Sequence, residues 1–115
     1  MKEPTLGNPQ NTIAVLQKYN FVFQKKFGQN FLIDTHVLDK IIRAAEITKD
    51  DFVLEIGPGI GTMTQYLACA AGKVAAVEID RALIPILEDT LDGYDNVTII
   101  NNDILKVDIA KLAEE

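Results

Sequence analysis

A glycine-rich turn at residues 55–62 separates a short apolar segment from an amphipathic one. It reads Glu-Ile-Gly-Pro-Gly-Ile-Gly-Thr, with glycine at every second position from Gly57 to Gly61. Glycine adopts positive φ without steric cost and lets a ligand lie against bare backbone, while the helix that follows such a turn offers free N–H groups. Open α/β sheets bind nucleotides at strand-to-helix turns of this kind. The turn therefore predicts a parallel α/β sheet with a nucleotide-type site.

The segments around this turn predict the strands and helices of such a sheet. Buried parallel strands are predicted where short apolar runs lack polar alternation, at 52–57, 74–79 and 97–101. Helical spacing predicts one connecting helix at 62–70 and another at 81–91, the second capped by Asp80 and kinked near Pro85. Right-handed crossovers then give an α/β fold of the doubly wound, partial Rossmann-like type, with about three parallel strands and flanking helices.

Helices are also predicted outside the β-α-β-α-β core. One near 9–19 begins after the cap Asn8 with proline at its first position, and another follows the cap Asp34 with an amphipathic apolar stripe. Asp108 is predicted to cap a last helix.

Composition limits the classes of protein that this chain can belong to. Its 115 residues suit one domain, and 48% hydrophobic residues with a mean hydropathy of +0.10 suit a packed core. No apolar run approaches the ~20 residues of a membrane span and no signal-like segment is visible, so we expect a cytoplasmic protein without a membrane partner. The single Cys69 can form neither an internal disulfide nor a clustered zinc site.

Charge is distributed unevenly along the chain. Residues 1–50 carry seven Lys/Arg against five Asp/Glu, whereas residues 51–115 carry four against twelve, and the net charge is −6. Nucleic-acid contacts need clustered Lys and Arg, so charge alone argues against RNA binding by this chain. Lys18, Lys25 and Lys26, with Lys40 and Arg43, are the residues that could form a basic patch, and a solvated face is the favoured interpretation.

The residues near the strand ends narrow the class of ligand. The glycine loop lacks the Gly-Lys-Ser/Thr ending of a triphosphate-binding P-loop. Glu78 ends the second predicted strand, where a carboxylate can accept hydrogen bonds from both ribose hydroxyls. Dinucleotide sites space their glycines G-x-G-x-x-G, whereas this chain has G-x-G-x-G with an acid two residues earlier, which favours S-adenosylmethionine. Asp103, just after the third strand, suits the adenine amino group.

Four segments follow one another along this chain: KKFGQNFLID at 25–34, EIGPGIGTMT at 55–64, EID at 78–80 and ND at 102–103. The first resembles the N-terminal cofactor motif of the adenine dimethyltransferases that modify small-subunit ribosomal RNA, and the other three are similar to that family's next three motifs. The resemblance implies a class I methyltransferase fold, S-adenosylmethionine as cofactor, and double methylation of adenine N6 by direct transfer from the sulfonium. Its implied partner is small-subunit ribosomal RNA or the immature small subunit.

The resemblance also implies a role for individual residues. Asn30 and the backbone at Leu32 would contact the methionine end of the cofactor, and Gly57 would contact it from the loop. Glu78 would hold the ribose, and Asp103 the adenine amino group. The related large-subunit methyltransferases that confer antibiotic resistance share Gln-Asn-Phe and the glycine loop, but usually carry a basic residue where this chain has Ile60. The small-subunit branch is therefore favoured.

The family's catalytic motif, Asn-Leu-Pro-Tyr after a fourth strand, does not occur in these 115 residues. We therefore expect an N-terminal fragment, with a helical extension at 1–24 and part of the cofactor domain at 25–115, that transfers no methyl group itself. An unpaired apolar strand at 52–56 predicts that it self-associates. The other interpretations are a fragment of an NAD-dependent enzyme, and a non-catalytic module that binds nucleosides or another protein.

Overall fold

A three-stranded parallel sheet organises the computed structural model, which describes residues 2–20 and 34–114. Strands β1 (Phe52–Ile56), β2 (Lys73–Glu78) and β3 (Val97–Asn101) lie in the order β1-β2-β3. In the register, Val53 lies opposite Val74, and Ala76 lies opposite Ile99. The predicted parallel α/β architecture is confirmed, and the strand ends differ from the prediction by a residue at most.

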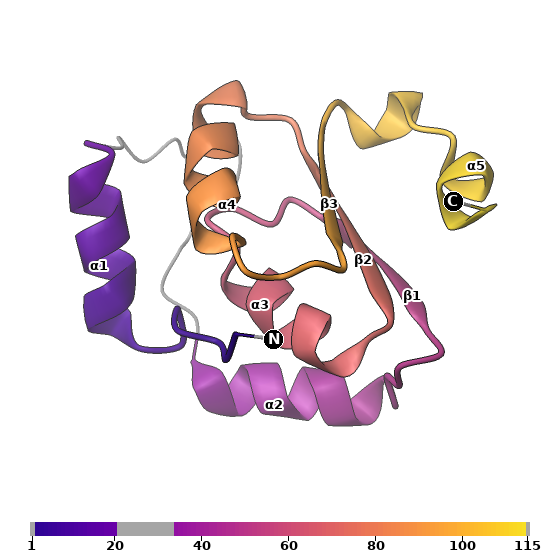
Figure 1. Cartoon of the computed structure of the whole chain (residues 1–115), viewed down its shortest axis with the longest axis horizontal. Helices are drawn as coiled ribbons and strands as arrows, with labels where there is room; N and C mark the ends of the chain where they lie inside the picture. The colour runs from indigo at the N-terminus through magenta and orange to yellow at the C-terminus, as the bar shows by residue number, and fades with distance from the viewer. Residues whose placement is uncertain (1, 21–33, 115) are drawn as a thin grey trace.

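The connections between the strands place two helices on the same face of the sheet. Helix α3 (Thr62–Ala70) connects β1 to β2, and the 3₁₀ turn η2 (Arg81–Leu83) with helix α4 (Ile84–Thr90) connects β2 to β3. Figure 1 shows α3 and α4 on one side of the strands and the C-terminal helix α5 on the other. Right-handed crossovers between neighbouring strands in sequential order require this arrangement.

The predicted continuous helix at 81–91 is instead divided into η2 and α4. Pro85 is the second residue of α4, a position where its missing N–H breaks no intrahelical bond. The predicted cap is confirmed, because the Asp80 carboxylate accepts a hydrogen bond from the Ala82 backbone N–H at 3.0 Å. Proline therefore starts a new helix here instead of kinking a long one.

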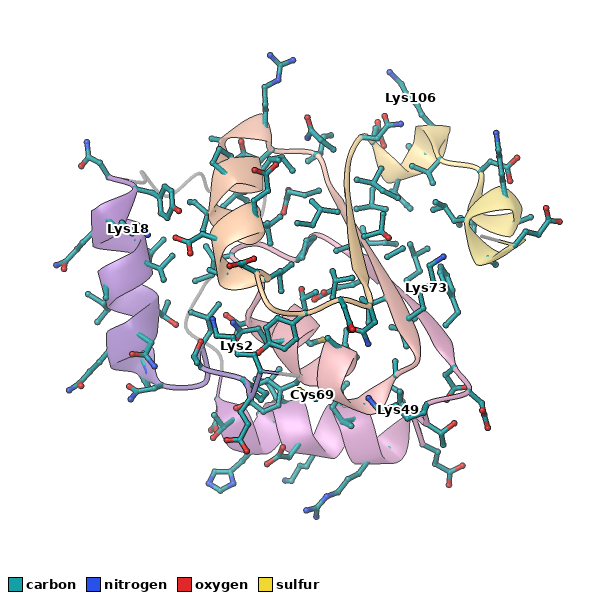
Figure 2. The ribbon with its side chains drawn as sticks, viewed as in Figure 1. Lys2, Lys18, Lys49, Cys69, Lys73 and Lys106 are labelled. Carbon is teal, nitrogen blue, oxygen red and sulfur yellow. The ribbon has the colours of Figure 1, made fainter. Side chains whose placement is uncertain are left out.

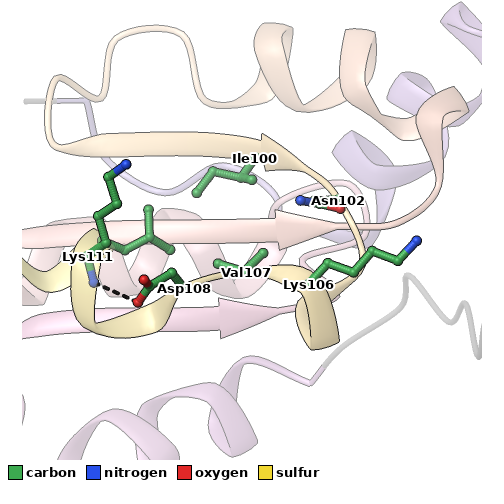
Figure 3. Close-up of a pocket in the computed structure, with 7 residues that line it drawn as sticks. Ile100, Asn102, Lys106, Val107, Asp108 and Lys111 are labelled. Carbon is green, nitrogen blue, oxygen red and sulfur yellow. Dashed lines mark hydrogen bonds between the residues drawn. The ribbon is translucent and has the colours of Figure 1, made fainter.

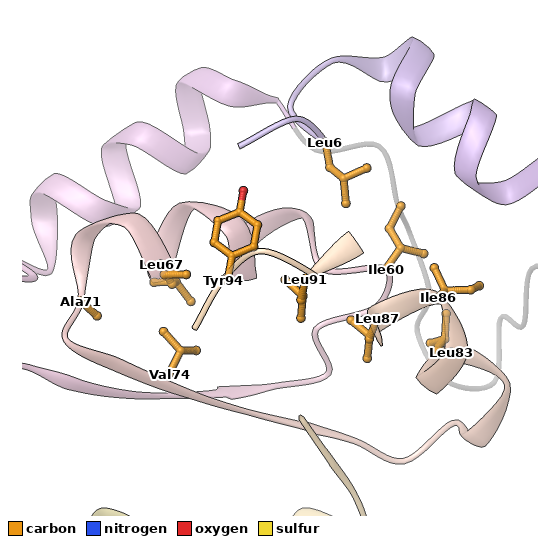
Figure 4. Packing of buried hydrophobic residues seen from close by; sticks show 11 residues of the cluster. Leu6, Ile60, Leu67, Ala71, Val74, Leu83, Ile86, Leu87, Leu91 and Tyr94 are labelled. Atoms are coloured by element: carbon orange, nitrogen blue, oxygen red, sulfur yellow. The ribbon is translucent and has the colours of Figure 1, made fainter. Parts of the chain in front are cut away.

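The hydrophobic core lies between the sheet and the helices α3 and α4 (Figure 4). Strand residues alternate between the two faces of a sheet, so Val53, Val97 and Ile99 face this core, whereas Ile56 on the opposite face is 61% exposed. The core is formed by buried side chains of the sheet, the helices and the N-terminal segment: Leu6, Ile60, Leu67, Val74, Leu83, Ile86, Leu87, Leu91 and Tyr94.

A buried glutamine fastens the N-terminal segment to this core. Gln65 of α3 is fully buried, and its Oε1 accepts hydrogen bonds from the backbone N–H groups of Thr5 and Leu6, both at 2.9 Å. Its Nε2 donates to the Thr90 carbonyl at 2.8 Å. Because every polar group of this amide is paired, residues 2–7 belong to the same packed unit as the sheet. The predicted boundary between residues 24 and 25 lies outside the described residues.

Helix α1 (Pro9–Lys18) follows this segment and lies beside α4. Asn8 caps it by accepting a hydrogen bond from the Gln10 N–H at 2.9 Å, as predicted. At its other end Lys18, labelled in Figure 2, forms a 2.7 Å ion pair with Asp89 of α4, and the Tyr19 hydroxyl donates to the same carboxylate. The exposed ion pair contributes little to stability, whereas Val15, Leu16 and Tyr19 are partly buried against the hydrophobic core.

The remaining helices are α2 (Thr35–Ala44), the 3₁₀ turn η3 (Ile104–Lys106) and α5 (Ile109–Glu114). Asp34 caps α2 through the His36 N–H at 2.8 Å, and Asp108 accepts from the Lys111 N–H at 3.1 Å in the first turn of α5, so both predicted caps are confirmed. The amphipathic stripe of α2 is only partly buried, since Leu38 is enclosed but the side chains at 37 and 41 are exposed. No helix in the described part of the chain is long and apolar enough to span a membrane.

Candidate cofactor site

The carboxyl ends of the three strands meet at one edge of the sheet and bring three of the predicted site residues together. The Gly57 N–H donates to the Val77 carbonyl at 2.9 Å, which continues the ladder just past β1. Glu78 lies opposite Asn101 in the register, and its carbonyl accepts from the Asn102 N–H at 3.1 Å. Neighbouring strands lie ~4.8 Å apart. Gly57, Glu78 and the residues just after β3 therefore line one edge.

The other two predicted site residues, Asn30 and Leu32, lie outside the described residues. Their predicted contacts with the methionine end of the cofactor stay predictions.

The glycine loop has the backbone conformation that its sequence predicts. Gly57, Gly59 and Gly61 have φ angles of +70°, +63° and +97°, which residues with a side chain rarely adopt. A Cβ at Gly61 would lie 2.9 Å from the Thr90 hydroxyl oxygen, so packing against α4 also requires glycine there. Among residues 2–20 and 34–114, no atom lies within 4 Å of the position that a Cβ at Gly57 would occupy. The described part of the chain thus leaves room for a ligand to approach the Gly57 backbone.

Glu78 fastens this loop to the end of β2. The residue is only 4% exposed, and both of its carboxylate oxygens accept backbone hydrogen bonds, Oε1 from the Gly59 N–H at 3.1 Å and Oε2 from the Asp80 N–H at 3.0 Å. A carboxylate has about four acceptor positions, so each oxygen retains capacity for one further donor. Glu78 can therefore hold the loop and accept hydrogen bonds from ligand hydroxyls at the same time.

Asp103 caps the 3₁₀ turn η3. Its Oδ1 accepts a hydrogen bond from the Leu105 N–H at 2.9 Å, and the residue is half-buried. Its other carboxylate oxygen accepts no hydrogen bond within the ranges that the structure describes. The capping bond fixes the orientation of the side chain and leaves that second oxygen as an acceptor for an amino group.

Glu55 is the acid two residues before the first glycine that favoured S-adenosylmethionine, although the sequence analysis assigned no ligand contact to it. Its side chain lies on the helix-facing side of β1, two residues before the glycine loop, and accepts a hydrogen bond from the Thr64 hydroxyl of α3. Burial raises the pKa of the Glu55 carboxyl to about 7, the Thr64 hydroxyl opposes this rise, and the nearby charge of Glu78 adds to it. In the sequence, a charged residue at an inward-facing position of a predicted strand could have indicated that Glu55 has a special environment.

A further polar group lies where α3 begins. Thr62, its first residue, is only 2% exposed, and its hydroxyl oxygen has no hydrogen-bond partner in the described part of the chain. The first N–H groups of a helix also lack intrahelical partners. The first N–H groups of α3 and the carboxylates of Glu78 and Asp103 fit a ligand that carries hydroxyl, amino and carboxylate groups. The described residues therefore fit S-adenosylmethionine.

A separate pocket lies between β3 and the C-terminal segment that follows it (Figure 3). It has a volume of about 200 Å³, and Ile100 and Asn102 line it together with Val107, Lys111 and other residues of the C-terminal segment. None of Gly57, Glu78 and Asp103 lines it. This pocket therefore adjoins the edge where the predicted site residues gather, since Asn102 belongs to both, but none of those predicted residues faces it.

Solved structures of methyltransferases share this fold. The 23S rRNA methyltransferase ErmE matches 69% of this chain and 32% of its own length with a TM-score of 0.64 and 39% identity. A dimethyladenosine transferase from Plasmodium falciparum matches 64% of this chain and 28% of its own length with a TM-score of 0.60 and 38% identity. Methyltransferases solved with S-adenosylhomocysteine, at 21% to 25% identity, have the same fold. The fold is that of the class I, Rossmann-like methyltransferases.

The sequence comparisons identify the family. The family described as "Ribosomal RNA adenine dimethylase" matches residues 20–115, and the chain belongs to it. The ribosomal RNA small subunit methyltransferase A of Lachnoclostridium phytofermentans is 75% identical over 111 residues, which are 96% of this chain and 38% of that protein. The chain thus spans about 38% of the length of this curated relative.

Proposed function

We propose that this chain forms the S-adenosylmethionine-binding part of an enzyme that dimethylates adenine N6 in small-subunit ribosomal RNA. The observation that carries the proposal is the convergence of Gly57, Glu78 and Asp103 at one sheet edge, in a chain that belongs to the adenine dimethylase family. Bound there, the cofactor supplies an activated methyl group. The chain's own residues would bind and orient it.

Each residue's place in the structure supports a specific role. The two oxygens of Glu78, already oriented by backbone N–H groups, would accept hydrogen bonds from the ribose hydroxyls. Asp103 would accept from the adenine amino group through its remaining oxygen. Gly57 would let the amino-acid end lie against the loop, with Asn30 and the backbone at Leu32 as its further partners. A ligand held at three points is positioned as well as bound.

The identity to relatives supports the small-subunit branch. The Lachnoclostridium relative, named a small-subunit methyltransferase, is 75% identical, against 39% for the 23S enzyme ErmE. Ile60 stands where the large-subunit enzymes usually carry a basic residue, and it is buried in the core. The RNA partner would then be small-subunit ribosomal RNA or the immature subunit, and we propose that residues outside this acidic chain make most of the phosphate contacts.

Calorimetry with S-adenosylmethionine and NAD tests the proposed ligand class. We expect the chain to bind S-adenosylmethionine or S-adenosylhomocysteine and not NAD, because the loop has G-x-G-x-G spacing and Asp103 is available for an adenine amino group. Stronger binding of NAD would favour the oxidoreductase interpretation. Binding of adenosine alone with the same affinity would favour a nucleoside-binding module, and binding of none of these would favour a protein-interaction module.

We also propose that the 115-residue chain self-associates through β1. Within the residues that the structure describes, β1 pairs with β2 on one side only, and its outward-facing Ile56 is exposed. An unpaired apolar edge strand recruits another strand. We expect light scattering to show dimers or larger species, and Ile56→Lys to shift them toward monomer, because a lysine on an edge strand disfavours pairing.

Ile13→Lys is the matched control for this experiment. Ile13 lies on α1, away from the sheet, and is also exposed, so the same substitution there should leave the association unchanged. A compact monomer at all practical concentrations, with slowly exchanging amides at 52–56, would contradict the proposal.

A further inference from the structure

Thr90, the last residue of α4, joins that helix to the glycine loop. Its side-chain hydroxyl donates a hydrogen bond at 2.6 Å to the carbonyl of Ile60, which lies between the second and third glycines of the loop. Thr90 is 6% exposed and Ile60 is 1% exposed, so this bond is closed off from water. Glu78 binds the N–H of the preceding residue, Gly59. The loop is therefore held at two consecutive residues, once from β2 and once from α4.

The backbone of Thr90 is bound in turn to the N-terminal segment through Gln65. Gln65 Nε2 donates to the Thr90 carbonyl at 2.8 Å, and Gln65 Oε1 accepts from the backbone N–H groups of residues 5 and 6. Leu6 also belongs to the same buried cluster as Ile60 (Figure 4). We call this connection between the start of the chain and the glycine loop the N-terminal brace, which consists of Thr5, Leu6, Gln65 and Thr90.

The glycine loop needs support from outside because its own backbone has unusual freedom. Glycine can adopt more backbone conformations than any other residue, and ordering it costs correspondingly more entropy. Gly57, Gly59 and Gly61 all have positive φ, so contacts from other segments must select the conformation that binds a ligand. A site that is ordered before the ligand arrives loses less entropy on binding. A group that fixes the loop therefore raises the affinity without touching the ligand.

We propose that the N-terminal brace positions the glycine loop for the cofactor, with Thr90 as its positioning residue. The inference rests on the proposed binding of S-adenosylmethionine. Gln65 is fully buried, and both ends of its amide are bonded within the protein, so it acts on the ligand only through the loop. The first residues of the chain then contribute to cofactor binding, although none of the proposed ligand contacts involves them.

Thr90→Val tests this proposal, because valine has the shape of threonine and lacks its hydroxyl. We expect calorimetry to show about fivefold to tenfold weaker binding of S-adenosylmethionine. In the ligand-free chain, the Gly59 and Gly61 amides, both hydrogen-bonded in the structure, should exchange about tenfold faster relative to the amides of β2. The β2 amides report overall stability, so this comparison separates positioning of the loop from a merely structural effect.

Two further variants are matched controls. Thr90→Ser retains the hydroxyl and should restore most of the wild-type affinity and loop exchange. Thr98→Val makes the same substitution at an exposed position of β3 and should change neither.

Gln65→Met tests the N-terminal side of the brace and keeps the proposal testable if Thr90→Val fails to fold. Methionine is an unbranched, flexible side chain without an amide, so we expect the same weaker binding and faster loop exchange, although the loop itself loses no direct bond. Wild-type affinity in either folded variant, or loop and β2 amides that exchange faster in equal proportion, would overturn the proposal. Failure of the wild-type chain to bind S-adenosylmethionine would instead overturn the proposed cofactor function, and loop exchange in the ligand-free chain would still test the brace.

Discussion

The 115-residue chain is expected to transfer no methyl group to ribosomal RNA, even with S-adenosylmethionine bound. It contains no Asn-Leu-Pro-Tyr segment, whose polar groups would accept hydrogen bonds from the target amino group and whose aromatic ring would stack on the extruded base. The donor is already activated, so positioning of the adenine is the main contribution that catalysis needs. Tritium transfer to ribosomal RNA or to immature small subunits should remain at background.

A hybrid protein provides the positive control. The part of the Lachnoclostridium relative that follows its matched region can be joined to this chain, with which the matched region is 75% identical. We expect the hybrid to transfer methyl groups to small-subunit RNA, and Glu78→Ala in the hybrid to reduce that transfer. Turnover by the 115-residue chain alone would contradict the prediction.

Replacing Glu78 with alanine is expected to weaken cofactor binding by about 1 to 3 kcal/mol, or roughly fivefold to 150-fold in affinity. The substitution removes an acceptor for the ribose hydroxyls. It also leaves the N–H groups of Gly59 and Asp80 without their present partner, so the free energy of unfolding of the ligand-free chain should fall by about 2 kcal/mol. Calorimetry and urea unfolding measure the two effects separately.

Two further variants separate the ligand contact from the support of the loop. Glu78→Gln retains the shape of the side chain but only one acceptor oxygen, so we expect intermediate losses of affinity and stability. Glu88→Ala removes an exposed carboxylate from α4 and should change neither. If Glu78→Ala left the affinity for S-adenosylmethionine unchanged in a folded chain, the assigned site would be wrong.

The sequence alone was sufficient for features that depend on neighbouring residues. The caps Asn8, Asp34 and Asp80 each form a hydrogen bond two residues along the chain, so local residue preferences predict them. The apolar strands and the intervening helices likewise follow from short-range periodicity. Because these strands are parallel, their carboxyl ends must share one edge, and the gathering of Gly57, Glu78 and the end of β3 could be predicted without coordinates.

Tertiary structure decided which distant groups the buried side chains of the core and of the site bind. Gln65 joins residues about sixty positions earlier in the chain, and Glu78 binds a backbone N–H nineteen positions away; no local pattern encodes either contact. The burial that raises the pKa of Glu55 exists only in the folded chain, where the Thr64 hydroxyl of α3 also donates to this carboxyl. Periodicity along the chain determines which face of a helix or strand a residue occupies. The hydrogen-bond partner of its side chain and the surrounding dielectric depend on which segments of the chain pack against that face.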